Sequence, residues 1–100
     1  MNKVKLSKTG QLYIPKALTN ILNIEVGDII NIFLDGKKII LTRKVGLGKE
    51  NKCTYNQKGT IYIPAEIRRL CNIDAEAVFT ITIDEKEKRV CLIPVLTGCK

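Results

Sequence analysis

The chain of 100 residues contains no histidine. It therefore has no Ser-His or Cys-His pair to activate a nucleophile, and it cannot form a mixed Cys/His zinc site. It also lacks a P-loop and a G-x-G-x-x-G motif, because no helix with phosphate-binding features follows Gly46 and Gly48. The acidic residues are scattered through turns and helix starts, where they are common. We expect no enzymatic activity, no metal and no cofactor.

Long apolar runs are missing as well. None approaches the roughly 20 residues that span a bilayer, and Met1 leads into a lysine-rich segment rather than into the apolar core of a signal peptide. Apolar residues nevertheless make up 45% of the chain, which favours a folded protein over a disordered one. These features predict a cytoplasmic protein that does not contact the membrane.

The cysteines lack the spacing of a metal site. The sequence has Cys53, Cys71, Cys91 and Cys99, and no two of them form a C-x-x-C pair. In the internal repeat described below, the first three align with Val4, Leu22 and Ile40. We therefore predict that they are small apolar residues of a core. Cys99, near the end of the chain, is predicted to be a free thiol.

Acidic residues are outnumbered by basic ones. Lysine and arginine total 17 against 10 acids, which gives a formal charge of +7. Such an excess suggests an anionic partner, although charge alone argues only for solubility and non-specific binding. The excess is uneven, because the acids of the second half nearly balance its cations.

One stretch of the sequence occurs twice without a gap. Residues 10–24 read GQLYIPKALTNILNI and residues 59–73 read GTIYIPAEIRRLCNI. The glycine, the Tyr-Ile-Pro and the Asn-Ile recur in register, which indicates an internal duplication. A unit of about 45 residues hardly buries a sufficient core by itself. The two copies therefore need each other, or a second chain, to be stable.

Each copy of this stretch predicts a short strand that ends at a proline and continues as a helix. Pro64 suits the first helical position, where its missing N–H is not needed. Asn72 suits the left-handed position that ends a helix. The first copy places Pro15 and Asn23 at the same points.

The second helix is predicted to have two distinct faces. Ile67, Leu70 and Cys71 follow at the spacing of one apolar stripe, which we expect to face a core. Arg68 and Arg69 then fall side by side in solvent.

Apolar periodicity and turn residues predict two strands, the helix and two more strands in each copy. Asp35-Gly36 is a hairpin signal in the first copy, and the matching loop of the second copy is longer. The predicted strands cover 3–6, 11–14, 29–34, 38–43, 52–55, 60–63, 77–83 and 89–93. We predict a first repeat over 1–43, a linker over 44–51, a second repeat over 52–95 and a tail over 96–100.

The repeated pattern K-x-G-x-x-x-I-P, followed by a short helix, an acidic turn and K-x-I-x-L, resembles the AbrB/SpoVT family of swapped-hairpin transition-state regulators in a tandem-repeat form. The residues that carry it are Lys8 to Ile24, Asp28, Asp35 and Lys38 to Leu41, and then Lys58 to Ile73, Asp84 and Lys88 to Leu92. The resemblance implies a mainly β fold with short helices, in which two ββαββ repeats lend each other a hairpin and form one β-barrel. Closure within one chain as a pseudo-dimer, or between chains of a homo-oligomer, stays open at this point.

The resemblance also implies contacts with double-stranded DNA, made by the first turn of each repeat and by the exposed helix face after the proline. By position, the contacts are Lys5, Lys8, Gln11, Thr19 and Asn20, and then Thr54, Lys58, Thr60, Arg68 and Arg69. Further phosphate contacts nearby are Lys3, Lys16 and Lys52. The arginines are the strongest candidates, because a guanidinium can bind a phosphate group or can form two hydrogen bonds to one guanine base. The predicted function is a DNA-binding transcriptional regulator.

Two departures from the family pattern bear on this function. The first copy has Thr19-Asn20 where the second has Arg68-Arg69, so the predicted DNA-binding face is asymmetric. Tyr13 and its counterpart are expected to face away from the core, for stacking on DNA or for packing against the neighbouring copy. The alternatives are an antitoxin of the MazE type, whose toxin would have to bind the barrel because the tail is too short to wrap it, and an oligomerisation module that binds no DNA.

Overall fold

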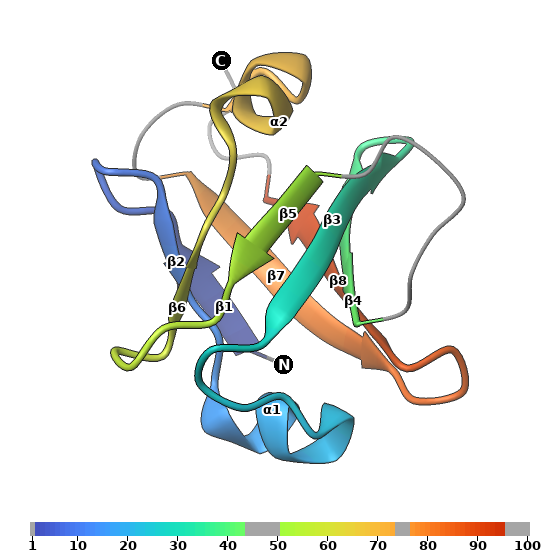
Figure 1. Cartoon of the computed structure of the whole chain (residues 1–100). Helices are drawn as coiled ribbons and strands as arrows, with labels where there is room; N and C mark the ends of the chain where they lie inside the picture. Colours follow the sequence, from blue (N-terminus) through green and yellow to red (C-terminus); the bar gives the residue numbers. More distant parts are fainter. Residues whose placement is uncertain (1, 44–50, 74–76, 96–100) are drawn as a thin grey trace.

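The computed structural model describes residues 2–43, 51–73 and 77–95 (Figure 1). The first half contains β1 (Asn2–Lys5), β2 (Gln11–Tyr13), α1 (Lys16–Leu22), β3 (Ile29–Asp35) and β4 (Lys38–Thr42). The second half contains β5 (Asn51–Thr54), β6 (Thr60–Tyr62), α2 (Ala65–Leu70), β7 (Val78–Asp84) and β8 (Arg89–Pro94). The order of elements is the predicted one, and the strand ends differ from the prediction by a single residue. Of the predicted linker, Asn51 belongs to β5 and the rest lies outside the described residues, as does the predicted tail.

The strands of the two halves are interleaved within one chain. A six-stranded sheet has the order β1-β7-β8-β4-β3-β5, and β2 pairs with β6 in a separate ribbon. In each half the first strand pairs with the third strand of the other half, and all these pairs are antiparallel. The sheet curls into a half-barrel that faces the ribbon (Figure 1). This arrangement confirms the predicted mainly β, swapped-hairpin barrel with short helices.

The strand registers show that the two halves are related by an approximate two-fold axis. Leu12 pairs with Ile61, which holds the matched position in the other copy. In the same way Ile40 pairs with its counterpart Cys91. Two matched residues can pair with each other only where a two-fold axis passes between them. The helices α1 and α2 accordingly lie at opposite ends of the molecule (Figure 1).

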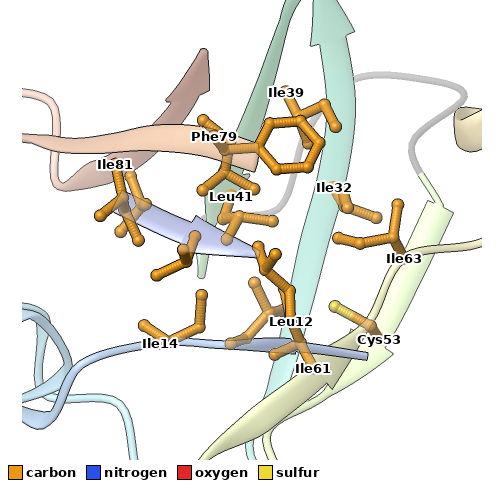
Figure 2. Close-up of a cluster of buried hydrophobic side chains, with 14 of the residues drawn as sticks. Leu12, Ile14, Ile32, Ile39, Leu41, Cys53, Ile61, Ile63, Phe79 and Ile81 are labelled. Atoms are coloured by element: carbon orange, nitrogen blue, oxygen red, sulfur yellow. The ribbon is translucent and has the colours of Figure 1, made fainter. Parts of the chain in front are cut away.

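The hydrophobic core lies between the ribbon and the inner face of the curled sheet. Leu12 and Ile61 of the ribbon and Ile32 and Phe79 of the sheet are all completely buried, and Figure 2 shows them directed toward one another. Because both halves contribute to this one cluster, neither half has a complete core of its own. Burial of apolar area is the main term that stabilises the interleaved fold.

The described cysteines are free thiols with three different environments. Cys53 is buried in the core, and Cys71 packs at its edge. The prediction is wrong for Cys91, which alternates with the inward residues of β8 and lies half-buried outside the core cluster. Cys99 lies outside the described residues.

The residues at the ends of the two helices show that two predictions are wrong and confirm a third. Pro64 is not the first helical residue but precedes it, because its ψ of 146° is extended. Asn23 and Asn72 have φ of 58° and 59° and end the helices in the left-handed region, as predicted. Leu70 does not face the core. It is 56% exposed, because α2 ends there and only Ile67 of that helix is buried.

In the ranges that the structure describes, no helix has the length and apolar character needed to cross a membrane. Nor do the side chains described there include a group of three or more potential metal ligands.

Candidate nucleic-acid interface

Two glycine turns and the outer side of the β2–β6 ribbon form one surface, which we call the turn face; the turns are residues 7–10 and 56–59. In the first turn, the Ser7 hydroxyl accepts hydrogen bonds from the backbone N–H of Thr9 at 3.2 Å and of Gln11 at 2.9 Å. Gly10 has a φ of +87°, a backbone conformation that is unfavourable for most residues other than glycine. The chain therefore returns into β2 within a tight, internally bonded turn.

The second turn is built the same way with a different side chain. The Asn56 carboxamide oxygen accepts from the backbone N–H of Lys58 at 2.9 Å and of Thr60 at 3.1 Å. Gly59 has a φ of +80°. Serine and asparagine are the residues that commonly form such side-chain turns, and here they hold the matched position three residues before each glycine.

Each turn is held by the other half of the chain. The backbone N–H of Ile63 donates to the Gly10 carbonyl at 2.8 Å, and that of Ile14 donates to the Gly59 carbonyl at 2.9 Å. Tyr62 lies across Gly10, where a Cβ would come within 2.9 Å of its ring, and Tyr13 lies across Gly59 at 3.2 Å. Both tyrosines point outward as predicted, and they pack against the neighbouring copy.

Polar side chains meet at the centre of the turn face. The Thr60 hydroxyl donates to the Gln11 side-chain oxygen at 2.9 Å, across the ribbon. A hollow of about 670 Å³ lies here, lined by Ser7, Thr9, Gln11, Asn56, Gln57, Lys58 and Thr60. The structure thus brings together three predicted site residues, Gln11, Lys58 and Thr60. Sequence reasoning missed the other four lining residues, although the matched Ser7 and Asn56 were a signal for them.

Arg68 is not in solvent beside Arg69, as the helical spacing predicted. It is half-buried, and its Nε donates to the Ile63 carbonyl at 3.0 Å while its Nη2 donates to the Tyr62 hydroxyl at 2.7 Å. Its guanidinium carbon lies 5.3 Å from the centre of the Tyr62 ring and would lie 3.2 Å from a Cβ at Gly10. Arg68 therefore holds the first turn in place from the second half, and Arg69 remains exposed.

The matched residues of α1 do different things. Thr19 is 2% exposed, and its hydroxyl donates to the Lys16 carbonyl at 2.9 Å. The implied DNA contact at Thr19 is therefore wrong, because the short side chain turns back onto its own helix inside the protein. Asn20 is exposed, as is its counterpart Arg69.

The remaining predicted residues are six lysines and Thr54, all exposed and lying in three places. Lys8 and Lys58 lie in the glycine turns, and Lys16 begins α1. The others are on the edge strands of the six-stranded sheet rather than on the ribbon: Lys3 and Lys5 on β1, Lys52 and Thr54 on β5. The Lys52 ammonium donates to the Asn31 side chain at 3.3 Å.

The turn face has basic side chains at both of its ends. The turn at 7–10, with Lys8, lies toward α2 and is in contact with Arg68. The turn at 56–59, with Lys58, lies toward α1, which begins at Lys16 (Figure 1). Neither the turns nor the ribbon contain an acidic residue. A polar surface with basic side chains at each end can bind two phosphate groups of a polyanion.

Comparisons with known proteins agree with this fold. Residues 3–49 match the model of a family described as "Antidote-toxin recognition MazE, bacterial antitoxin". A search of curated proteins gives no match. The solution structure of PHS018 from Pyrococcus horikoshii is similar with a TM-score of 0.55 over 99% of this chain and 94% of that chain, at 18% identity, so the likeness is one of fold. The first copy is thus similar in sequence to MazE-type antitoxins, and the finer resemblance to AbrB/SpoVT regulators stays a prediction.

Proposed function

We propose that the protein binds double-stranded DNA through the turn face and regulates transcription. The proposal rests on one observation: the turn face contains no acidic residue in its turns and ribbon and has basic side chains at both of its ends. The similarity of the first copy to MazE-type antitoxins supports it, because the chain shares a swapped-hairpin fold in which DNA binding is a known activity.

In this proposal the residues of the turn face have separate roles. Lys8 and Lys58 neutralise phosphates and release counterions, which supplies most of the affinity. Gln11 and Thr60, fixed against each other, offer hydrogen-bonding groups to the duplex. Arg68 acts by holding the first turn. Arg69 is the arginine that reaches the DNA.

The test is binding of a short, labelled duplex of mixed sequence at several salt concentrations. The double variant Lys8→Ala/Lys58→Ala should bind more weakly and should reduce the slope of log K against log salt by about two units, because two phosphate contacts are lost. Lys37→Ala/Lys86→Ala is the matched control, since it also removes two positive charges, from the exposed loops between β3 and β4 and between β7 and β8. Equal losses in the control and in the double variant would remove the turn face from the interface.

A second comparison tests the asymmetry. Arg69→Ala should lower the salt slope by about one unit, whereas Asn20→Ala at the matched position of α1 should leave the slope unchanged. Identical effects would mean that the duplex does not meet the helices in this way. If the unmodified protein failed to bind any duplex even at low salt, an oligomerisation module without DNA would be the better reading.

The antitoxin function is a second candidate, and the family match over residues 3–49 is the observation that favours it. An antitoxin forms a complex of fixed composition with its toxin. Purification from the native host should then yield a second small protein in a constant ratio, identified by mass spectrometry. Recovery of the chain alone would argue against this function.

A further inference from the structure

The two-fold relation allows the two ends of the molecule to be compared position by position. At each end a helix finishes at a left-handed asparagine, Asn23 or Asn72. Each end of the molecule also has the residue that closes a central strand, β4 at one end and β8 at the other. These two residues are Arg43, just after β4, and Pro94, the last residue of β8. They are matched because β4 and β8 pair symmetrically about Ile40 and Cys91.

At the α1 end, a side chain closes the space beside the helix. The Nη1 of Arg43 donates to the Asn23 carbonyl at 2.8 Å, and its Nε lies 3.7 Å from an Asp28 carboxylate oxygen. A cation at the C-terminal end of a helix is favourable, since the carbonyl ends carry partial negative charge. Leu22 is 8% exposed and completes the packing there.

At the α2 end, the matched residues are all smaller or less polar. Pro94 stands in place of Arg43, Cys71 in place of Leu22 and Ala77 in place of Asp28. A hollow of about 380 Å³ remains, lined by Gly36, Lys37, Leu70, Cys71, Asn72 and Pro94. We call it the α2 hollow. Within the described ranges 2–43, 51–73 and 77–95, side chains therefore fill this position at the α1 end and leave a hollow at the α2 end.

The chemistry of the α2 hollow fits a particular kind of occupant. Leu70 supplies exposed apolar surface, and Pro94 adds to it. Burial raises the pKa of the Cys71 thiol, which stays uncharged at neutral pH. The one charged group among the described lining residues is the exposed Lys37. An apolar floor beside a single cation complements an apolar group that carries a carboxylate next to it.

We propose that the α2 hollow binds a segment of a partner protein that presents an apolar side chain beside a carboxylate. The apolar side chain lies against Leu70 and Pro94, and the carboxylate lies at Lys37. The described lining residues of the α2 hollow are not part of the turn face.

The probe is a capped peptide with one leucine between glutamates, titrated into the isotope-labelled full chain and followed by amide chemical shifts. We expect saturable shifts at residues 36–37 and 70–72. The matched control peptide, with lysines in place of the glutamates, should bind about three- to fivefold more weakly, as is typical of one exposed ion pair.

Two variants sharpen the test. Pro94→Arg places the matched arginine of the α1 end into the hollow and should abolish the shifts at residues 70–72. Lys37→Glu, in an exposed turn, should reverse the preference between the two peptides and does not depend on how well the first variant folds. Equal affinities for both peptides, or shifts confined to the turn face, would overturn the proposal.

Discussion

The two halves of this chain have the same elements in the same order, yet they stabilise their helices differently. In α1 three residues are buried, Leu18, Thr19 and Leu22, whereas α2 buries only Ile67. The matched position of Thr19 carries Arg68, whose hydrogen bonds to the Ile63 carbonyl and the Tyr62 hydroxyl tie α2 to the strand before it. Its guanidinium also lies beside Gly10 of the first turn. One half thus relies on apolar packing where the other relies on polar contacts. A repeated backbone does not require repeated side-chain roles.

The largest effect is expected where this difference in packing is greatest. Leu22→Ala should lower the free energy of unfolding by about 2–4 kcal/mol, because it removes a buried side chain and leaves a cavity. Cys71→Ala, at the matched position, should cost about 1 kcal/mol or less, since the thiol is smaller and half exposed. Urea unfolding of both variants measures the two values. Equal losses would show that α2 packs as tightly as α1.

A smaller effect is expected at the turn glycines. Gly10→Ala should cost about 2–3 kcal/mol, because its Cβ would meet the Tyr62 ring at 2.9 Å in addition to the strain of a positive φ. Gly59→Ala should cost less, since the nearest ring atom lies at 3.2 Å.

Gly36→Ala is the control for the backbone alone. It also has a positive φ, but none of the described residues comes within 4 Å of its Cβ position, so we expect a cost of about 1 kcal/mol. Thermal or urea unfolding gives the ranking Gly10, Gly59, Gly36. If all three substitutions cost the same, the tyrosines do not restrict the turns.

The smallest effect concerns Cys53 and its counterpart Val4. Burial raises the pKa of the Cys53 thiol from 9.0 to about 11. Because the folded pKa lies above the unfolded one, the thiol's contribution to stability is complete below pH 9 and is lost as the pH rises toward 11.

Cys53→Val, which copies the first half, should remove this loss. At pH 10 the variant should have kept about 1 kcal/mol more of its neutral-pH stability than the unmodified chain. Urea unfolding at pH 7 and pH 10 measures the difference. Parallel pH profiles for the two proteins would mean that Cys53 ionises as freely in the fold as outside it.

Much of the fold could be predicted because it follows from local and repeated signals. Alternating apolar residues indicated the strands, Asn72 indicated the helix end, and the duplication indicated that two copies form one structure. The pairing within one chain could not be read from these patterns, since the same patterns allow exchange between two chains. Leu70 was assigned to the core because helical spacing does not show where a short helix ends.

The candidate site was less predictable, because its residues act across the two copies. Gln11 and Thr60 were named separately, but their hydrogen bond depends on the register of the ribbon. Arg68 was expected in solvent, since its partners Tyr62 and Gly10 come together only when the halves interleave. Thr19 was assigned by position alone, and position does not show that a threonine turns back onto its helix.

The exchange of strands between halves of one polypeptide has a consequence for how this protein behaves on dilution. A barrel assembled from two separate chains falls apart when its concentration drops below the dissociation constant. Here β1 finds β7 and β5 finds β3 on the same molecule, so the interlocked state forms in a unimolecular step. The melting temperature of this chain should therefore be the same at nanomolar and at micromolar protein.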